Sequence, residues 1–172
     1  MASPTVTAEI PAMYETENDI SASHRSELIA LMNQRLASAV DLQTQMKQAR
    51  WNVKGPNFIA LHELFDKVAE AVEGYVDVIA ERVVQLGGIA EGTVRLAGSR
   101  TRLPEYPAVI AAGAAHVEAV ARALSTFGKE ARDTIDEANA LDDAGTADIF
   151  TEVSRGIDKW LWFVEAHSQA AK

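Results

Sequence analysis

The segment NFIALHELFDKVAEAVEGYVDVIAERVVQL, residues 57–86, determines the fold class of this chain. Its apolar residues recur every three or four positions, the spacing that places them on one side of an α-helix. They are Phe58, Leu61, Leu64, Phe65, Val68, Val72, Val76 and Ile79. Gly87-Gly88 follows directly, and glycine commonly ends a helix because it tolerates left-handed backbone. The sequence therefore predicts one long amphipathic helix here.

Three further segments show the same helical period. They cover about residues 23–50, 107–140 and 146–170, and the middle one is rich in alanine. Residues 89–106 lack such a period and contain glycine and proline, so they form a connection with room for one short helix. The chain is therefore predicted to be all-α, with four long helices.

Local residue types mark the predicted helix ends. Ser21 and Ser23 are N-cap candidates for the first helix, because a hydroxyl can accept a hydrogen bond from an amide of the first turn. Pro107 is predicted to open the third helix. The segment 142–145, with two aspartates and a glycine, is predicted to form the turn into the fourth helix.

The lengths of the connections indicate how the helices are arranged. Short turns make antiparallel neighbours, and a long middle segment can cross the bundle. This order is typical of the ferritin-like four-helix bundle with a long crossover connection. Residues 1–22 are polar and lack a helical period, so we expect a flexible arm of residues 1–22 and one helical domain of residues 23–172.

Composition narrows the class of protein. A chain of 172 residues suffices for one domain with a sizeable core. The absence of cysteine excludes disulfides, thiolate zinc sites and cysteine nucleophiles. The formal net charge of −9 argues against a polyanion binder and suits a protein that attracts cations. We expect neither a signal peptide nor a membrane span, and a cytoplasmic location.

Four residues of the second predicted helix share one face. At about 100° per residue, His62, Asp66, Asp77 and Glu81 fall within a stripe about 100° wide. Imidazole and carboxylates together are a ligand set for Fe(II) or a similar divalent ion. The same pattern also fits an ordinary solvated acidic face, since this helix carries further glutamates.

One helix cannot close such a metal site. Asp66 and Asp77 are separated by about 16 Å along the axis, too far to share an ion. Two copies related by an antiparallel two-fold axis would bring His62 and Asp66 of one chain to Asp77 and Glu81 of the other. The spacing therefore suggests an intersubunit site, with Gly74 near the axis allowing the two helices to approach closely.

Several segments resemble one known family. KQARWNVKGPNFIALHELFD, residues 47–66, is similar to the signature of the Dps family (DNA-binding protein from starved cells), which are miniferritins of the ferritin-like superfamily. The resemblance continues in DVIAERVVQLGG, residues 77–88, and in TADIF and DKWLWF, residues 146–150 and 158–163.

This resemblance implies a function. Dps proteins form a shell of twelve subunits, oxidise Fe(II) with hydrogen peroxide and store ferric iron, which protects against oxidative stress. Their ferroxidase centre takes two histidines and an aspartate from one subunit and an aspartate and a glutamate from its two-fold partner. His62 and Asp66 match the second histidine and the aspartate, and Asp77 and Glu81 match the partner's pair.

The sequence departs from the family pattern at Arg50, which stands where the first histidine is expected. A guanidinium has no free lone pair, so it cannot bind iron. It could instead form bidentate bonds with Asp66, or with Asp77 or Glu81 of the partner. Two interpretations are open: a slower ferroxidase that uses the remaining ligands, or a centre in which Arg50 is a fixed counter-charge and iron is not oxidised.

Other residues gain a role only through the resemblance. Trp51 matches a tryptophan beside the family's centre, where an aromatic ring can intercept radicals, although packing at an interface is an equal explanation. Asp142, Asp143 and Asp148 lie where acidic residues line the entry pores of such cages, although an Asp-Asp pair is also common in turns. His116, like the two remaining histidines, matches no ligand position.

DNA binding, which names the family, is doubtful for this chain. Residues 1–22 contain no lysine or arginine, and an acidic shell repels phosphate. The alternative hypotheses are a catalytically inactive shell that protects or compacts DNA or passively stores metal, and a mixed cage in which a homologue supplies the missing histidine.

Overall fold

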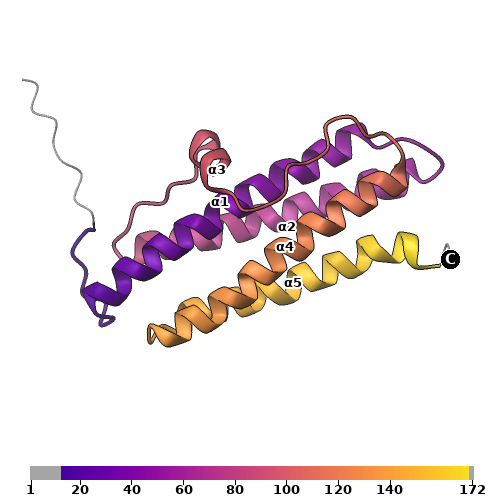
Figure 1. Cartoon of the computed structure of the whole chain (residues 1–172). Helices are drawn as coiled ribbons and strands as arrows, with labels where there is room; N and C mark the ends of the chain where they lie inside the picture. The colour runs from indigo at the N-terminus through magenta and orange to yellow at the C-terminus, as the bar shows by residue number, and fades with distance from the viewer. Residues whose placement is uncertain (1–12, 171–172) are drawn as a thin grey trace, which may run out of the picture.

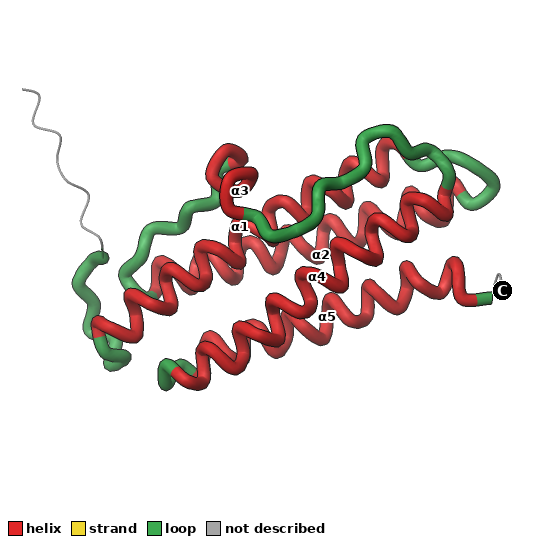
Figure 2. The backbone as a smooth tube through the Cα atoms, viewed as in Figure 1, coloured by secondary structure: helices red, strands yellow, loops and turns green. Residues whose placement is uncertain are grey.

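The computed structural model describes residues 13–170, and in this range it contains five helices and no strands. Figure 2 shows that the helices account for most of the described chain and that loops form the connections, the stretch before α1 and the end after α5. The helices are α1 (Ala22–Asn52), α2 (Phe58–Gln85), α3 (Val94–Arg100), α4 (Gly113–Ala140) and α5 (Ala144–Gln169). The prediction of an all-α fold with four long helices and one short helix in the long connection is confirmed.

The four long helices form a bundle of two hairpins. α1 packs mainly on α2, and α4 packs mainly on α5 (Figure 1). The short helix α3 lies against α1, and the chain then crosses the bundle to reach α4. Most of the predicted apolar stripe of α2 is buried, with Phe65, Val68 and Val72 fully enclosed in the core. This burial fixes α2 so that its opposite face points out of the bundle.

Two predicted helix ends are confirmed in detail. The Ser21 hydroxyl accepts a hydrogen bond from the backbone N–H of His24 (3.2 Å) and so caps α1. Gly87 has φ 89, and the backbone N–H of Gly88 donates to the carbonyl of Val83 (2.9 Å). This arrangement ends α2 at the expected pair of glycines, because only glycine adopts the left-handed conformation readily.

The predicted start of α4 at Pro107 is wrong, since the helix begins at Gly113. Residues 107–112 instead run beside the turn between α1 and α2. There the N–H of Lys54 donates to the carbonyl of Ala111 (2.8 Å), and the N–H of Gly113 donates to the carbonyl of Lys54 (3.2 Å). Backbone groups held by this long-range pairing cannot also form a helical turn. The turn into α5 is also shorter than predicted, because residue 145 already lies inside that helix.

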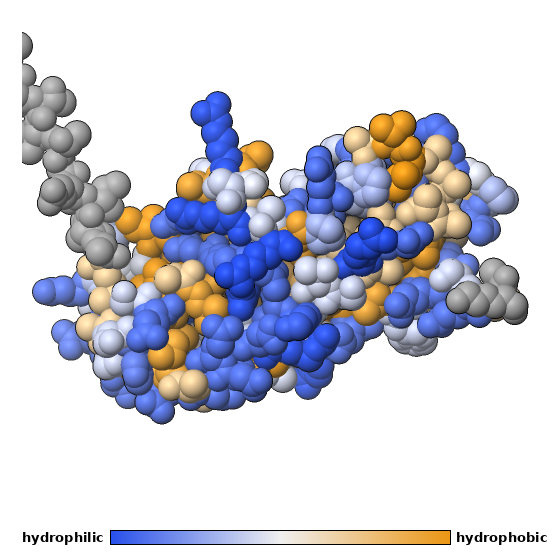
Figure 3. All heavy atoms as spheres, viewed as in Figure 1, coloured by the Kyte–Doolittle hydropathy of each residue, from blue (hydrophilic) through white to orange (hydrophobic). Residues whose placement is uncertain are grey.

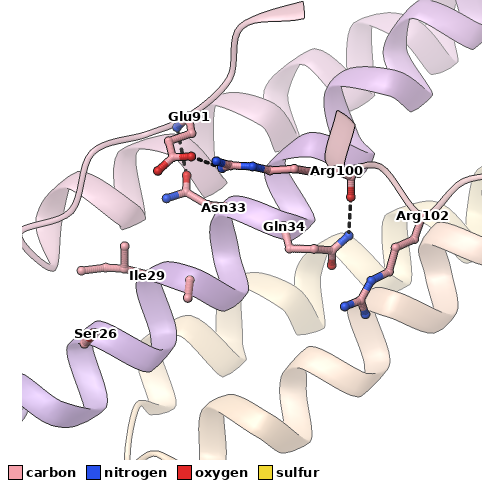
Figure 4. Close-up of a pocket in the computed structure, with 8 residues that line it drawn as sticks. Ser26, Ile29, Asn33, Gln34, Glu91, Arg100 and Arg102 are labelled. Atoms are coloured by element: carbon pink, nitrogen blue, oxygen red, sulfur yellow. Dashed lines mark hydrogen bonds and ion pairs between the residues drawn. The ribbon is translucent and has the colours of Figure 1, made fainter. Parts of the chain in front are cut away.

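Side chains of α1 fasten the long connection to the bundle (Figure 4). The Asn33 amide donates to the carbonyl of Ile89 (3.0 Å), and its oxygen accepts from the N–H of Glu91 (2.9 Å). Glu91 also pairs with Arg100 of α3. The pocket drawn in Figure 4, of about 520 Å³, lies between α1 and this connection.

The predicted arm of residues 1–22 lies partly outside the described residues, since the structure describes the chain from residue 13 onward. Within residues 13–21, the N–H of Tyr14 donates to the carbonyl of Gly87 (2.7 Å), which places this stretch beside the end of α2. Figure 3 shows a largely hydrophilic surface on the face that it draws, with separate apolar patches. No helix among residues 13–170 is long and apolar enough to span a membrane.

Candidate metal centre

His62 lies in the first part of α2, and its orientation is fixed by the end of α1. Its Nδ1 is 2.9 Å from the backbone carbonyl oxygen of Arg50. A carbonyl can only accept a hydrogen bond, so Nδ1 carries the hydrogen and Nε2 carries the lone pair. The ring of Phe58 lies beside it, with centroids 5.1 Å apart. Within residues 13–170, Nε2 of His62 has no hydrogen-bond partner and is of the kind that binds a divalent metal, and the other nitrogen is held by the backbone.

Asp66, one turn further along α2, is already paired with two cations from α1. Its Oδ1 lies 2.6 Å from Nζ of Lys47 and 2.9 Å from Nε of Arg50. The contact with Arg50 has the distance of an ion pair but not the geometry of a hydrogen bond. The hydrogen bond from Lys47, with further attraction from both cations, lowers the pKa of Asp66. The carboxylate is thus ionised and neutralised within its own chain.

Arg50 contacts Asp66 through Nε alone rather than through the bidentate fork that the sequence suggested. Lys47 was missed, although it lies three residues before Arg50 on the same helix. Residues three apart share a helix face, so the position of Arg50 was itself a signal that Lys47 would reach the same carboxylate.

Asp77 and Glu81, in the second half of α2, are exposed. Within residues 13–170 neither forms an ion pair, and no three histidine, aspartate or glutamate side chains gather into a metal cluster. The four candidate ligands therefore fall into two separate pairs on α2: His62 with Asp66, and Asp77 with Glu81. One chain alone does not bring these pairs together.

Apolar side chains accompany the four candidate ligands on the outer face of α2. Ile59 is 62% exposed and Val84 is 58% exposed, and both point in nearly the same direction around the helix as Asp77. Trp51, at the end of α1, is 64% exposed. A methyl group at Gly74 would meet no atom within 4 Å, so the chain itself does not require glycine there. Exposed apolar residues around a polar pair are typical of a surface that another protein covers.

The three acidic residues assigned to a pore differ in their environment. Asp142, with φ 60, and Asp148 are exposed. Asp143 is only 2% exposed and caps α5, since its Oδ1 accepts from the backbone N–H of Thr146 (2.9 Å) and pairs with Nη2 of Arg82 (2.8 Å). Asp143 therefore faces its own chain rather than solvent.

The bundle with a crossover connection places the chain in the ferritin-like class of proteins, and comparison with known proteins agrees. The family model for a ferritin-like domain matches residues 29–172. The DNA protection during starvation protein of Agrobacterium fabrum is 44% identical over 156 residues, covering 91% of this chain and 96% of that protein.

Solved structures narrow the class further. A Dps structure from Mycobacterium smegmatis, in a tetragonal form, has a TM-score of 0.86 at 30% identity and covers 91% of this chain and 96% of its own. DpsA14 from Streptomyces coelicolor has a TM-score of 0.88 at 31% identity, with coverages of 93% and 95%. The chain belongs to the Dps group of the ferritin-like family.

Proposed function

We propose that this chain is the subunit of an iron-sequestering miniferritin, a homo-oligomeric and dodecameric cage. Its proposed reaction is the oxidation of Fe(II) by hydrogen peroxide, followed by storage of the ferric iron, which limits oxidative stress. The chain is proposed to act in the cytoplasm. The observation that carries this proposal is His62, whose Nε2 is free while Nδ1 is held at 2.9 Å by the Arg50 carbonyl.

The proposed centre forms between two copies of α2. His62 and Asp66 of one chain would face Asp77 and Glu81 of the two-fold partner, which supplies carboxylates that are exposed and lack an ion pair in the described part of the chain. The exposed apolar side chains on the same face support such an interface. One imidazole and three carboxylates are a suitable set of ligands for Fe(II), which is here the substrate.

Lys47 and Arg50 set the condition for iron entry. Both cations contact Oδ1 of Asp66, and both repel Fe(II). Iron that binds Asp66 through Oδ1 must therefore displace them. The side chains of Lys47, Arg50 and Asp66 are partly exposed, so water can replace part of a lost contact, and we propose a slower ferroxidase rather than an inactive one.

The second candidate function is a shell without ferroxidase activity that protects or compacts DNA, or passively stores metal. The two cations on Asp66 favour it, and relatives such as the Agrobacterium fabrum protein carry DNA protection in their name. The net charge of −9 opposes direct DNA binding by the shell.

Entry of iron through the shell is proposed to involve the turn before α5. Asp142 and Asp148 are exposed and could attract cations, whereas Asp143 would only hold the turn in place through Arg82 and the cap on α5. Trp51 is proposed to intercept radicals formed at the centre, since it follows Arg50 and is exposed.

The test is anaerobic loading of the iron-free protein with Fe(II), followed by a pulse of hydrogen peroxide while ferric absorbance is recorded. We expect the protein to oxidise Fe(II) faster than protein-free buffer, and Arg50→His to be at least about tenfold faster than the natural chain, equivalent to about 1.4 kcal/mol in the barrier. Arg122→His is the matched control, because within the described residues Arg122 pairs only with Glu118, on the surface of α4.

The outcomes separate the two candidate functions. A natural chain that matches the protein-free rate, with activity restored in Arg50→His, would overturn the ferroxidase proposal and favour the inactive shell. Equal rates for the natural chain and Arg50→His would show that Arg50 does not limit the centre. Acceleration by Arg122→His as well would point to adventitious iron binding by the new histidine.

A further inference from the structure

Tyr106 and His116 form a hydrogen-bonded pair that the candidate metal centre does not use. The phenolic oxygen of Tyr106 lies 2.6 Å from Nδ1 of His116, and the two rings are stacked with centroids 6.0 Å apart. Tyr106 lies half-buried in the connection before α4, and His116 lies in the first turn of α4 with 1% of its surface exposed.

The protonation states of the pair follow from burial. Burial lowers the pKa of His116, and the charge of Lys54 lowers it further, so the ring is neutral near pH 7. Burial also raises the pKa of Tyr106, so the phenol keeps its proton. In the neutral tautomer that carries its hydrogen on Nε2, Nδ1 of His116 accepts the hydrogen of the Tyr106 phenol. In this tautomer His116 is a proton acceptor already in place for Tyr106.

The other nitrogen of His116 indicates how a second proton would be accommodated. Nε2 is buried, and within the described residues it has no hydrogen-bond partner of regular geometry. The backbone carbonyls of Ile110 and Asn52 nevertheless favour the protonated ring. An imidazolium formed at this position would thus meet carbonyl dipoles rather than only apolar groups.

Tyr106 also shares a groove with a tryptophan that is exposed in the single chain. Tyr106 and Trp51 line the same open groove, of about 900 Å³, together with residues of the connection around α3. Trp51 follows Arg50, whose carbonyl accepts the hydrogen bond of His62. Trp51 and Tyr106 are thus two oxidisable side chains that share one groove, and Trp51 follows the residue whose carbonyl holds His62.

We propose that Tyr106 and His116 form a radical-holding site in which Tyr106 gives up one electron while its phenolic proton moves to Nδ1 of His116. The oxidant is a one-electron oxidant, either a tryptophanyl radical at Trp51 or a species of the hydroxyl-radical class made from Fe(II) and peroxide. When the tryptophanyl radical is the oxidant, it takes the electron from Tyr106 and a proton from solvent and returns to tryptophan. The products are a neutral tyrosyl radical and a His116 imidazolium, and reduction by an external donor reverses both transfers.

The identity of the natural oxidant rests on the proposed function, because that oxidant would arise at the iron centre. Electron transfer from Tyr106 to a radical at Trp51 does not rest on it. The test therefore uses azide radicals generated by pulse radiolysis in oxygen-free, iron-free buffer, since these oxidise tryptophan without any metal. The decay of the indolyl radical and the growth of the phenoxyl radical are followed by absorbance and by electron paramagnetic resonance. A protein without ferroxidase activity can still show electron transfer from Tyr106 to Trp51 in this test. Failure of the radical-holding site is therefore distinguishable from failure of the proposed ferroxidase function.

Substitutions test whether the phenoxyl signal comes from Tyr106. We expect Tyr106→Phe to lose most of the phenoxyl signal and Trp51→Phe to slow its growth. The matched controls, Tyr14→Phe and Tyr75→Phe, remove the two other tyrosines and are expected to leave the signal unchanged. A phenoxyl signal that persists at full amplitude in Tyr106→Phe would overturn the assignment.

The role of His116 needs a readout that a merely structural residue would not change. Growth of the phenoxyl radical in the natural chain should slow in deuterated buffer, because a proton moves with the electron. His116→Gln, which cannot accept the proton in the same way, should form the radical more slowly and lose this isotope effect. An unchanged rate and isotope effect in His116→Gln would refute proton transfer to His116.

Because His116 is buried, circular dichroism checks that the His116→Gln variant folds. The isotope effect of the natural chain needs no substitution, and it must itself exceed unity for the proposal to hold.

Discussion

Two arginines of α1, Arg35 and Arg50, form ion pairs in opposite environments. Arg35 is 3% exposed, and its guanidinium donates to the Thr134 hydroxyl (2.7 Å) and to Glu137 of α4 (3.1 Å). It also lies 3.6 Å from Glu130, which is itself buried. The Arg50 side chain keeps 29% of its surface exposed and contacts Asp66, of which 42% is exposed.

The difference in burial separates a structural ion pair from one that can exchange. Glu130 is buried with Arg35, so no water could solvate its charge if Arg35 moved away. The cluster therefore holds α1 firmly against α4. The side chains of Arg50 and Asp66 are both partly exposed, although Nε of Arg50 is buried, so water can replace part of a lost contact and the net free energy of this pair is smaller than that of a buried one. Asp66 can therefore leave its cations for another ligand, whereas Glu130 cannot.

The largest expected effect comes from breaking the buried cluster. Arg35→Met leaves Glu130 buried without its cation, and we expect the free energy of unfolding to fall by about 3–5 kcal/mol. Urea unfolding at a fixed protein concentration measures this change. The double variant Arg35→Met/Glu130→Gln should recover part of the loss, because the uncompensated charge is gone. A double variant as unstable as the single one would show that packing, not charge, is what Arg35 supplies.

The ion pair between Arg82 and Asp143 lies between these two in burial. The Arg82 side chain is 16% exposed and that of Asp143 is 2% exposed. Asp143→Asn keeps a residue that can cap α5 but removes the charge that faces Arg82, so we expect a loss of about 1 kcal/mol near neutral pH. Asp142→Asn is the control, since the adjacent residue is exposed and asparagine also tolerates its φ of 60.

The same pair predicts how stability depends on pH. Burial alone would raise the pKa of Asp143, but hydrogen bonds from Thr146 and the charge of Arg82 lower it overall. Stability from a carboxylate with a lowered folded-state pKa is fully present above the unfolded value of about 3.9 and is lost as the pH falls through the folded value. Below about pH 4 the natural chain should therefore lose its advantage over Asp143→Asn. A difference between the two that stays constant from pH 7 to pH 3 would contradict this assignment.

The sequence predicted the fold well because most of it depends on local patterns. The period of α2 and the glycines after it defined that helix to within a residue. The start of α4 was missed because Pro107 is a local signal, whereas the pairing of Lys54 with Ala111 joins residues far apart in the chain. Local propensity carries no information about such a contact.

The candidate site was predictable only in part for the same reason. Helical spacing along α2 defined the stripe from His62 to Glu81, since all four residues lie on one helix. The cations on Asp66 come from a second helix, and the cation paired with Asp143 is Arg82 of α2. Neither ion pair can be read from the sequence pattern around Asp66 or Asp143.

The smallest expected effect on stability comes from the partly exposed pair of Arg50 and Asp66. Arg50→Met should change the free energy of unfolding by less than about 1 kcal/mol, in contrast to Arg35→Met on the same helix. Urea unfolding of the two variants side by side compares a buried and a partly exposed arginine with the same substitution. A loss at Arg50 as large as that at Arg35 would show that Arg50 is structural and that Asp66 is not free to exchange.

Arg50→Met also separates the two ways in which Arg50 could limit iron binding. The positive charge of Arg50 repels Fe(II) and is paired with Asp66. Methionine removes this charge but supplies no imidazole, whereas histidine removes the charge and also supplies an imidazole. If the charge is the main obstacle, anaerobic Fe(II) binding measured by calorimetry should tighten in Arg50→Met nearly as much as in Arg50→His. If the missing ligand dominates, only Arg50→His should bind more tightly. We expect the first result, because Asp66 already has Lys47 as a second cation and each charge removed from that oxygen favours the metal.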